Sequence, residues 1–149
     1  MVNQRIELSG LVLKKYNKKM IIKSAAIIIK DRSVLFLREK NFLYWITPGG
    51  KIEEGETPEE ALNREIMEEL SVKVKIIENL GIIKGKAFKG DDLVPIKMYL
   101  YKVNLLDQVR LDSEIIDQTY IKYCNIHNYL MTPIGLKIVK FLFDKGMID

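Results

Sequence analysis

The chain has 149 residues, 48% of them apolar, which is enough to bury the core of one domain. It contains no long uncharged apolar run that could span a membrane, and residues 1–16 lack the apolar stretch of a signal peptide. The one cysteine, Cys124, excludes an internal disulfide and is typical of a reducing cytoplasm. We therefore expect a single domain over residues 1–149, cytoplasmic and without a membrane partner.

The charges of the chain are divided unevenly. The net charge is +4, but residues 53–69 hold eight acids and one base, so this window carries −7 and leaves +11 for the rest. A basic surface around an acidic site could steer a polyphosphate toward it, or give weak, nonspecific affinity for RNA. Ordinary solvated lysines explain most of the surplus, and we expect no specific nucleic-acid partner.

Strand-like segments precede the acidic window. Residues 6–13 are an extra strand-like stretch that the pattern does not place. Residues 21–29 and 34–37 are apolar, β-branched runs separated by a polar turn, which predicts a hairpin of buried strands. Residues 44–47 predict a short strand that ends at the turn Pro48-Gly49-Gly50.

The acidic window then predicts a helix with clear start signals. Thr57 is expected at the N-cap, Pro58 at the first helical position and Glu60 in a capping box. Residues three or four apart share a helix face, so one face of this helix is apolar and a neighbouring face is acidic. The apolar stripe is Leu62, Ile66 and Leu70, and the acidic face is Glu65, Glu68 and Glu69.

The three glutamates of the acidic face indicate a metal site. Like charges at these spacings repel by about a few tenths of a kcal/mol per pair, whereas a divalent cation bound by carboxylate oxygens turns that cost into a gain. The alternative is a solvated acidic face. Such faces usually carry a lysine or arginine four residues on, and here only Glu60 has that partner, in Arg64.

The second half of the chain predicts more strands and a second helix. Residues 72–77 and 80–84 are strand-like, 84–92 are expected to form a polar loop, and 96–104 and 119–123 predict further strands. Thr132-Pro133 predicts the start of an amphipathic helix that ends at Gly146, with Ile134, Ile138, Phe141 and Leu142 on one side. This order favours an α+β fold with a mixed sheet between helices.

The run Gly50-x5-Glu56-x7-Arg64-Glu65-Ile66-x-Glu68-Glu69-x-Ser71-Val72 resembles the signature of the Nudix hydrolases, and its flanks resemble the mutator-type members. The resemblance implies a Nudix α/β/α sandwich. Every fixed position matches except the last glycine, where this chain has Ser71. A positive φ is common there, and it costs a non-glycine residue about 1 kcal/mol.

The resemblance also implies the chemistry of the site. Mg²⁺, with Mn²⁺ as an alternative, would be held by the Gly50 carbonyl and the three helix glutamates, and Glu56 and Arg64 would form a supporting ion pair. Glu68 is the preferred general base. A further carboxylate from outside the signature is expected to be Glu114, with Asp91 and Asp92 as competitors, and Glu114 is equally well explained as an ordinary loop acid.

Three residues are candidates for contact with substrate. Arg38 could meet a phosphate or the base, Lys51 could meet a phosphate, and Trp45 could stack on a base. Each also has an ordinary explanation, as a surface charge or as core. We expect hydrolysis of a nucleoside triphosphate to monophosphate and pyrophosphate, with an oxidised nucleotide as one option. Alternatives are another nucleoside diphosphate derivative, a 5′-triphosphate RNA end, or a ligand sensor without catalysis. Family habit makes a homodimer plausible.

Overall fold

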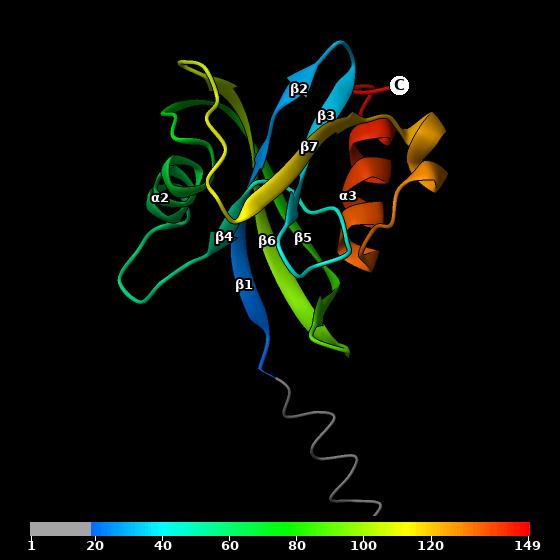
Figure 1. The fold of residues 1–149 in the computed structure, drawn as a ribbon, viewed down its shortest axis with the longest axis horizontal. Coiled ribbons are helices and arrows are strands. Elements are labelled where there is room, and N and C mark those ends of the chain that lie inside the picture. Colours follow the sequence, from blue (N-terminus) through cyan, green and yellow to red (C-terminus); the bar gives the residue numbers. More distant parts are fainter. Residues whose placement is uncertain (1–18) are drawn as a thin grey trace, which may run out of the picture.

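The computed structural model describes residues 19–149, which form two β-sheets between two helices (Figure 1). One sheet has the strand order β4-β1-β6-β5 and the other β2-β3-β7. β1 and β6 are parallel and all other pairs are antiparallel, so the expected α+β sandwich with a mixed sheet is confirmed. The elements are β1 (Ile21–Ile27), β2 (Ile29–Lys30), β3 (Ser33–Glu39), β4 (Gly49–Lys51), α2 (Pro58–Leu70), β5 (Val74–Lys89), β6 (Asp92–Leu105), β7 (Ile115–Ile121), the 3-10 helix η1 (Tyr123–Asn128) and α3 (Pro133–Asp144).

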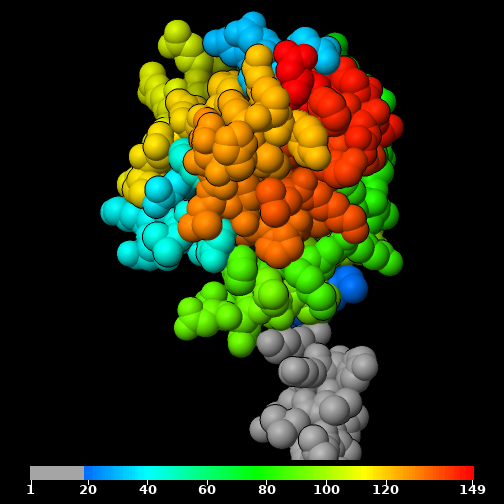
Figure 2. Space-filling model, turned by 90° about the vertical axis from the view of Figure 1, so that its right-hand side faces the viewer, coloured from blue at the N-terminus to red at the C-terminus, as the bar shows by residue number. Residues whose placement is uncertain are grey.

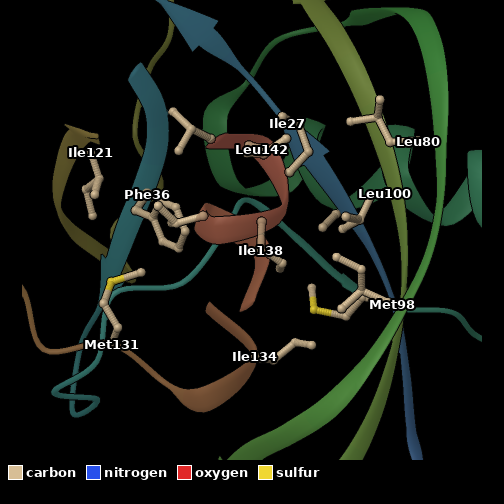
Figure 3. Close-up of a cluster of buried hydrophobic side chains, with 14 of the residues drawn as sticks. Ile27, Phe36, Leu80, Met98, Leu100, Ile121, Met131, Ile134, Ile138 and Leu142 are labelled. Atoms are coloured by element: carbon tan, nitrogen blue, oxygen red, sulfur yellow. The ribbon is translucent and has the colours of Figure 1, made fainter. Parts of the chain in front are cut away.

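The larger hydrophobic core lies beneath α3. Figure 3 shows Ile134, Ile138 and Leu142 of this helix among side chains from both sheets, including Phe36 and Leu100. Thr132 caps the helix as expected, because its hydroxyl accepts a hydrogen bond from the Gly135 N–H at 3.1 Å. This core therefore holds the two sheets and α3 in one unit.

The second core lies beneath α2. The predicted stripe Leu62, Ile66 and Leu70 is fully buried there. Alternation along the strands supplies both cores, since Ala25 and Ile27 of β1 face α3 whereas Ala26 faces α2. β1 is thus the shared wall between the two halves of the sandwich.

Several expected boundaries are wrong. Residues 84–92 are not a polar loop: they continue β5 and turn into β6, in a hairpin whose register runs from Val74–Leu105 to Lys89–Asp92. β5 is an edge strand of its sheet. Many of its polar side chains are exposed to solvent, while its backbone still pairs with β6. Residues 44–47 make isolated bridges, Leu37–Ile46 and Trp45–Met131, instead of a strand.

Other differences concern where the elements begin and end. The run 21–29 divides after Ile27, because β1 joins one sheet and β2 the other. The last helix ends at Asp144, two residues before Gly146. The strand-like stretch 6–13 lies outside the described residues. None of the helices within residues 19–149 has the length and apolar character needed to cross a membrane.

Candidate active site

The carboxylates sit on α2, whose two ends are capped. Thr57 Oγ1 accepts a hydrogen bond from the Glu60 N–H at 3.2 Å, and Pro58 occupies the first turn, as the sequence predicts. Ser71 ends the helix in the left-handed region, with φ 54° and ψ 36°, and its N–H bonds to the Met67 carbonyl. The two caps therefore define a helix over Pro58–Leu70 that contains all three glutamates of the acidic face, Glu65, Glu68 and Glu69.

The turn before the helix packs tightly against its neighbours. A Cβ on Gly49 would lie 2.1 Å from the Ser24 carbonyl oxygen, and one on Gly50 would lie 2.2 Å from Glu65 Cδ. The Gly49 N–H donates a hydrogen bond to Glu69 Oε1 at 2.7 Å. Only glycines let the main chain come this close to the carboxylates of α2, so the Gly50 carbonyl also lies in their neighbourhood.

Arg64 ties the turn to the helix. Its guanidinium donates to both oxygens of Glu56 at 2.8 Å, to the Lys51 carbonyl at 3.0 Å and to Glu65 Oε1 at 2.9 Å. It also reaches Glu68 Oε1 at 3.4 Å. The two-point contact with Arg64 lowers the pKa of Glu56 to about 2. One arginine thus organises three of the acids expected in the site.

Burial raises the pKa of the carboxylates that face the turn. Glu69 is 8% exposed, and desolvation raises its pKa to about 8, against the hydrogen bond from Gly49. Burial is also the first cause of the raised pKa of Glu65. Glu68 is different, with 58% of its side chain exposed. The first two acids are therefore costly to ionise without a compensating positive charge.

These acids line a cleft of about 450 Å³. Of the acids proposed from the sequence, Glu65, Glu68, Glu69 and Glu114 lie in its wall, whereas Asp91 and Asp92 do not. The wall also contains Glu39, Glu53 and Asp112, which sequence reasoning missed. The full lining is Lys23, Glu39, Gly49, Gly50, Lys51, Glu53, Glu65, Glu68, Glu69, Asp112, Glu114 and Ile115.

The segment before β7 is hydrogen-bonded to the end of α2. The N–H of Arg110 donates to the Leu70 carbonyl, and that of Asp112 to the Glu69 carbonyl, both at 2.9 Å. The Asp112 carboxylate accepts a hydrogen bond from the Glu114 N–H at 3.2 Å. Because free carbonyls at a helix end need donors, the segment that satisfies them also carries two more acids to the cleft.

The donor set fits a hard divalent cation. Carboxylate and carbonyl oxygens are the ligands that Mg²⁺ and Mn²⁺ prefer, and a cation beside the buried Glu69 would favour its ionised form. Within residues 19–149, no three acidic, histidine or cysteine side chains are already gathered into a cation site. Glu65 and Glu68 each direct one oxygen at the Arg64 guanidinium, at 2.9 and 3.4 Å.

A second, mainly apolar cavity of about 280 Å³ adjoins the cleft and shares Lys23, Glu39 and Gly49 with it. Figure 2 shows the face of the molecule where the 40–48 segment, the β5–β6 hairpin and the start of α3 come together. The remaining lining is Phe42, Ile46, Thr47, Ala87, Phe88, Gly90, Ile96, Met98, Thr132, Ile134, Gly135 and Ile138.

Aromatic rings stand beside this cavity. Phe88, at the end of the hairpin, stacks on Tyr44 with ring centroids 4.5 Å apart, and Phe42 lies 5.6 Å from Tyr44. Of the expected substrate residues, Lys51 lines the cleft, but Arg38 and Trp45 line neither space. The Arg38 guanidinium lies 5.7 Å from the Trp45 ring centre, and its Nε is buried without a hydrogen-bond partner.

Comparison with known proteins identifies the family to which this chain belongs. The NUDIX domain family model matches residues 20–133. An ADP-ribose pyrophosphatase of Methanocaldococcus jannaschii is 28% identical over 163 residues, covering 83% of this chain and 95% of the relative. An 8-oxo-dGTP diphosphatase of Proteus vulgaris is 35% identical over 63 residues, covering 39% of this chain and 56% of the relative. The match to a Bacillus subtilis relative likewise spans 50% of that protein's length.

Solved structures share the fold. The E. coli ORF135 protein superposes with a TM-score of 0.68 at 22% identity, covering 87% of this chain and 92% of the other. The MutT protein of Methanosarcina mazei superposes with a TM-score of 0.68 at 22% identity, covering 87% and 96%.

Proposed function

Since the chain belongs to the NUDIX domain family and has the fold and carboxylate helix of its pyrophosphohydrolases, we propose that it hydrolyses a nucleoside triphosphate to monophosphate and pyrophosphate. One observation carries this proposal: the acidic cleft and the apolar cavity adjoin, with Lys23, Glu39 and Gly49 in the walls of both. A diphosphate beside the acids and a base in the cavity would occupy both spaces. An oxidised nucleoside triphosphate has both a diphosphate and a base, and is one such substrate.

The residues of the cleft suit Mg²⁺ or Mn²⁺. The Gly50 carbonyl and Glu65, Glu68, Glu69 and Glu114 would hold it, and when bound it would neutralise phosphate charge and make a water more acidic. Arg64 sets the positions of Glu65 and Glu68, and the Gly49 N–H fixes Glu69. Removal of the cation by a chelator would leave Glu69 without a positive partner, whereas Glu65 would keep its contact with Arg64.

The proposed hydrolysis needs an acid that takes a proton from the attacking water and cations that hold the phosphate oxygens. Glu68 is exposed to the cleft, so it is the acid best able to take the proton from the attacking water. The water oxygen forms a bond to phosphorus, the bridging P–O bond breaks, and pyrophosphate leaves with the electron pair. Lys23 and Lys51, paired in register on β1 and β4, face the acids and can hold the phosphate oxygens.

The size of the cavity supports a mononucleotide. At about 280 Å³ it lies at the lower end for small-molecule sites, which favours one base over a dinucleotide. A second candidate is ADP-ribose or another nucleoside diphosphate derivative, because the match that covers 95% of its relative has an ADP-ribose pyrophosphatase as that relative. A non-catalytic sensor is disfavoured, since all the signature glutamates are kept. Cytoplasmic location and a homodimer stay expectations.

A nucleotide screen with Mg²⁺ tests the proposal. Released pyrophosphate is read separately from phosphate, for the wild-type chain and for Glu68→Gln. We expect pyrophosphate release from the wild type and at least a 100-fold loss in the variant, with unchanged circular dichroism. Glu54→Gln, an exposed acid outside both spaces, is the matched control and should keep full activity. Full activity of Glu68→Gln would refute its assignment as the base.

A further inference from the structure

Glu39 occupies a special place at the end of β3. The ladder with β7 passes from Arg38–Asp117 to Glu39–Ile115, so Ile116 is left out as a bulge. Bulges re-aim the side chains next to them and are common beside active sites. The turn after the strand is held by hydrogen bonds from the Lys40 N–H to the Glu114 carbonyl at 2.8 Å and from the Phe42 N–H to the Glu39 carbonyl at 3.4 Å.

Glu39 is the one acid in the walls of both the cleft and the cavity. It is half-buried, and within the part of the chain that the structure describes its carboxylate accepts no hydrogen bond and forms no ion pair. Its two oxygens can therefore accept hydrogen bonds from a ligand that brings hydroxyl donors to this point.

The order of groups in a nucleotide decides what reaches Glu39. With the diphosphate in the acidic cleft and the base in the apolar cavity, the sugar must lie at their junction. Of the side chains at this junction, Lys23 is a cation suited to phosphate and Glu39 is an acceptor. A carboxylate would repel a phosphate, whereas two neighbouring hydroxyls can both donate to its two oxygens.

We propose that Glu39 is a specificity-determining residue that accepts hydrogen bonds from the 2′- and 3′-hydroxyls of a ribose, so that the site prefers ribonucleotides to 2′-deoxyribonucleotides. The inference rests on the proposed function, since it assumes a nucleotide laid across the two spaces. Hydrogen bonds to a charged acceptor imply a preference of about 10- to 100-fold in kcat/KM. The preference acts mainly through KM, because the hydroxyls are far from the breaking bond.

The test compares ATP with 2′-dATP, and GTP with 2′-dGTP, in wild type, Glu39→Gln and Glu39→Ala. We expect the wild-type ribo preference to fall to about unity in Glu39→Ala and to an intermediate value in Glu39→Gln, which keeps one acceptor. Activity toward the deoxynucleotides should fall less than activity toward the ribonucleotides, because a deoxynucleotide loses the acceptor for its 3′-hydroxyl alone. Glu78→Ala is the matched control, because Glu78 is an exposed acid of β5 that lines neither space.

The affinity for Mn²⁺ separates this role from that of a cation ligand. Mn²⁺ affinity, measured by electron paramagnetic resonance without nucleotide, should be unchanged in Glu39→Ala. Equal losses for ribo- and deoxynucleotides, or weakened Mn²⁺ binding, would overturn the proposal, and so would a wild type that does not distinguish the two sugars. If no nucleotide is hydrolysed, the proposed function fails by itself. Calorimetric binding of α,β-methylene ATP and its 2′-deoxy form then decides the role of Glu39 by the same ratio.

Discussion

Replacing Gly50 with alanine tests whether the position of the Glu65 carboxylate matters. The added Cβ would lie 2.2 Å from Glu65 Cδ and 2.5 Å from both of its oxygens, far inside contact distance. The atoms that it meets are the end of a flexible side chain, and Gly50 does not have a positive φ. The chain should therefore fold, while the Glu65 carboxylate is pushed aside by an ångström or more.

A displacement of this size has a known effect on the reaction rate. Moving a reacting or positioning group by about 1 Å costs about 100-fold in rate, so we expect kcat/KM to fall by about two orders of magnitude in Gly50→Ala. Gly55→Ala is the contrasting variant: a Cβ there meets nothing within 4 Å, but Gly55 has φ +82°. It should lose about 1 kcal/mol of stability and keep its activity.

The assay pairs pyrophosphate release with urea unfolding for both variants. Gly49→Ala completes the series, since its Cβ would strike the Ser24 main chain and prevent correct folding. If Gly50→Ala were fully active with a normal unfolding transition, the Glu65 carboxylate would not need its observed place. The argument from the close approach of turn and helix would then be wrong.

Three further outcomes are expected. Ser71→Gly should raise the free energy of unfolding by roughly 0.5–1 kcal/mol in urea, because it removes the left-handed strain at φ 54°; a loss would contradict this. Arg64→Lys should destabilise the chain at neutral pH, since lysine cannot make the two-point contact with Glu56. The pKa of Glu56 is lowered to about 2, so this deficit should be present above its ordinary pKa of 4.5 and vanish as the pH falls toward 2, as followed by thermal melts. Glu69→Gln should raise the free energy of unfolding in chelator by roughly 4 kcal/mol at pH 8 and not at pH 4, because burial raises the Glu69 pKa to about 8 and its charge is costly above about 4.5.

The local features of the site were predictable because they are written in neighbouring residues. The Thr57 cap, the buried stripe Leu62, Ile66 and Leu70, and the left-handed Ser71 all depend on contacts within a few residues. Such contacts leave a periodic or positional trace in the sequence. The same holds for the second helix and its Thr132 cap.

What escaped prediction depends on contacts between distant segments. Asp112 reaches the cleft because its N–H bonds to the Glu69 carbonyl, and Glu39 because a bulge against β7 ends its strand. Nothing around either acid distinguishes it from a surface residue in sequence alone. The hairpin at 84–92 was missed for a related reason: polar side chains on an edge strand face water and imitate a loop.

β1 lies between the half of the fold that carries the acids and the half that forms the apolar cavity. Its residues pair with β4, which carries the glycine turn, and with β6, whose Ile96 and Met98 line the apolar cavity. The acids depend on α2 and its core, whereas the cavity depends on α3 and the other core. Changes to the cavity wall can therefore alter which base or sugar is accepted without moving the carboxylates. Under the proposed function, such changes would alter the preferred nucleotide and leave the hydrolysis intact.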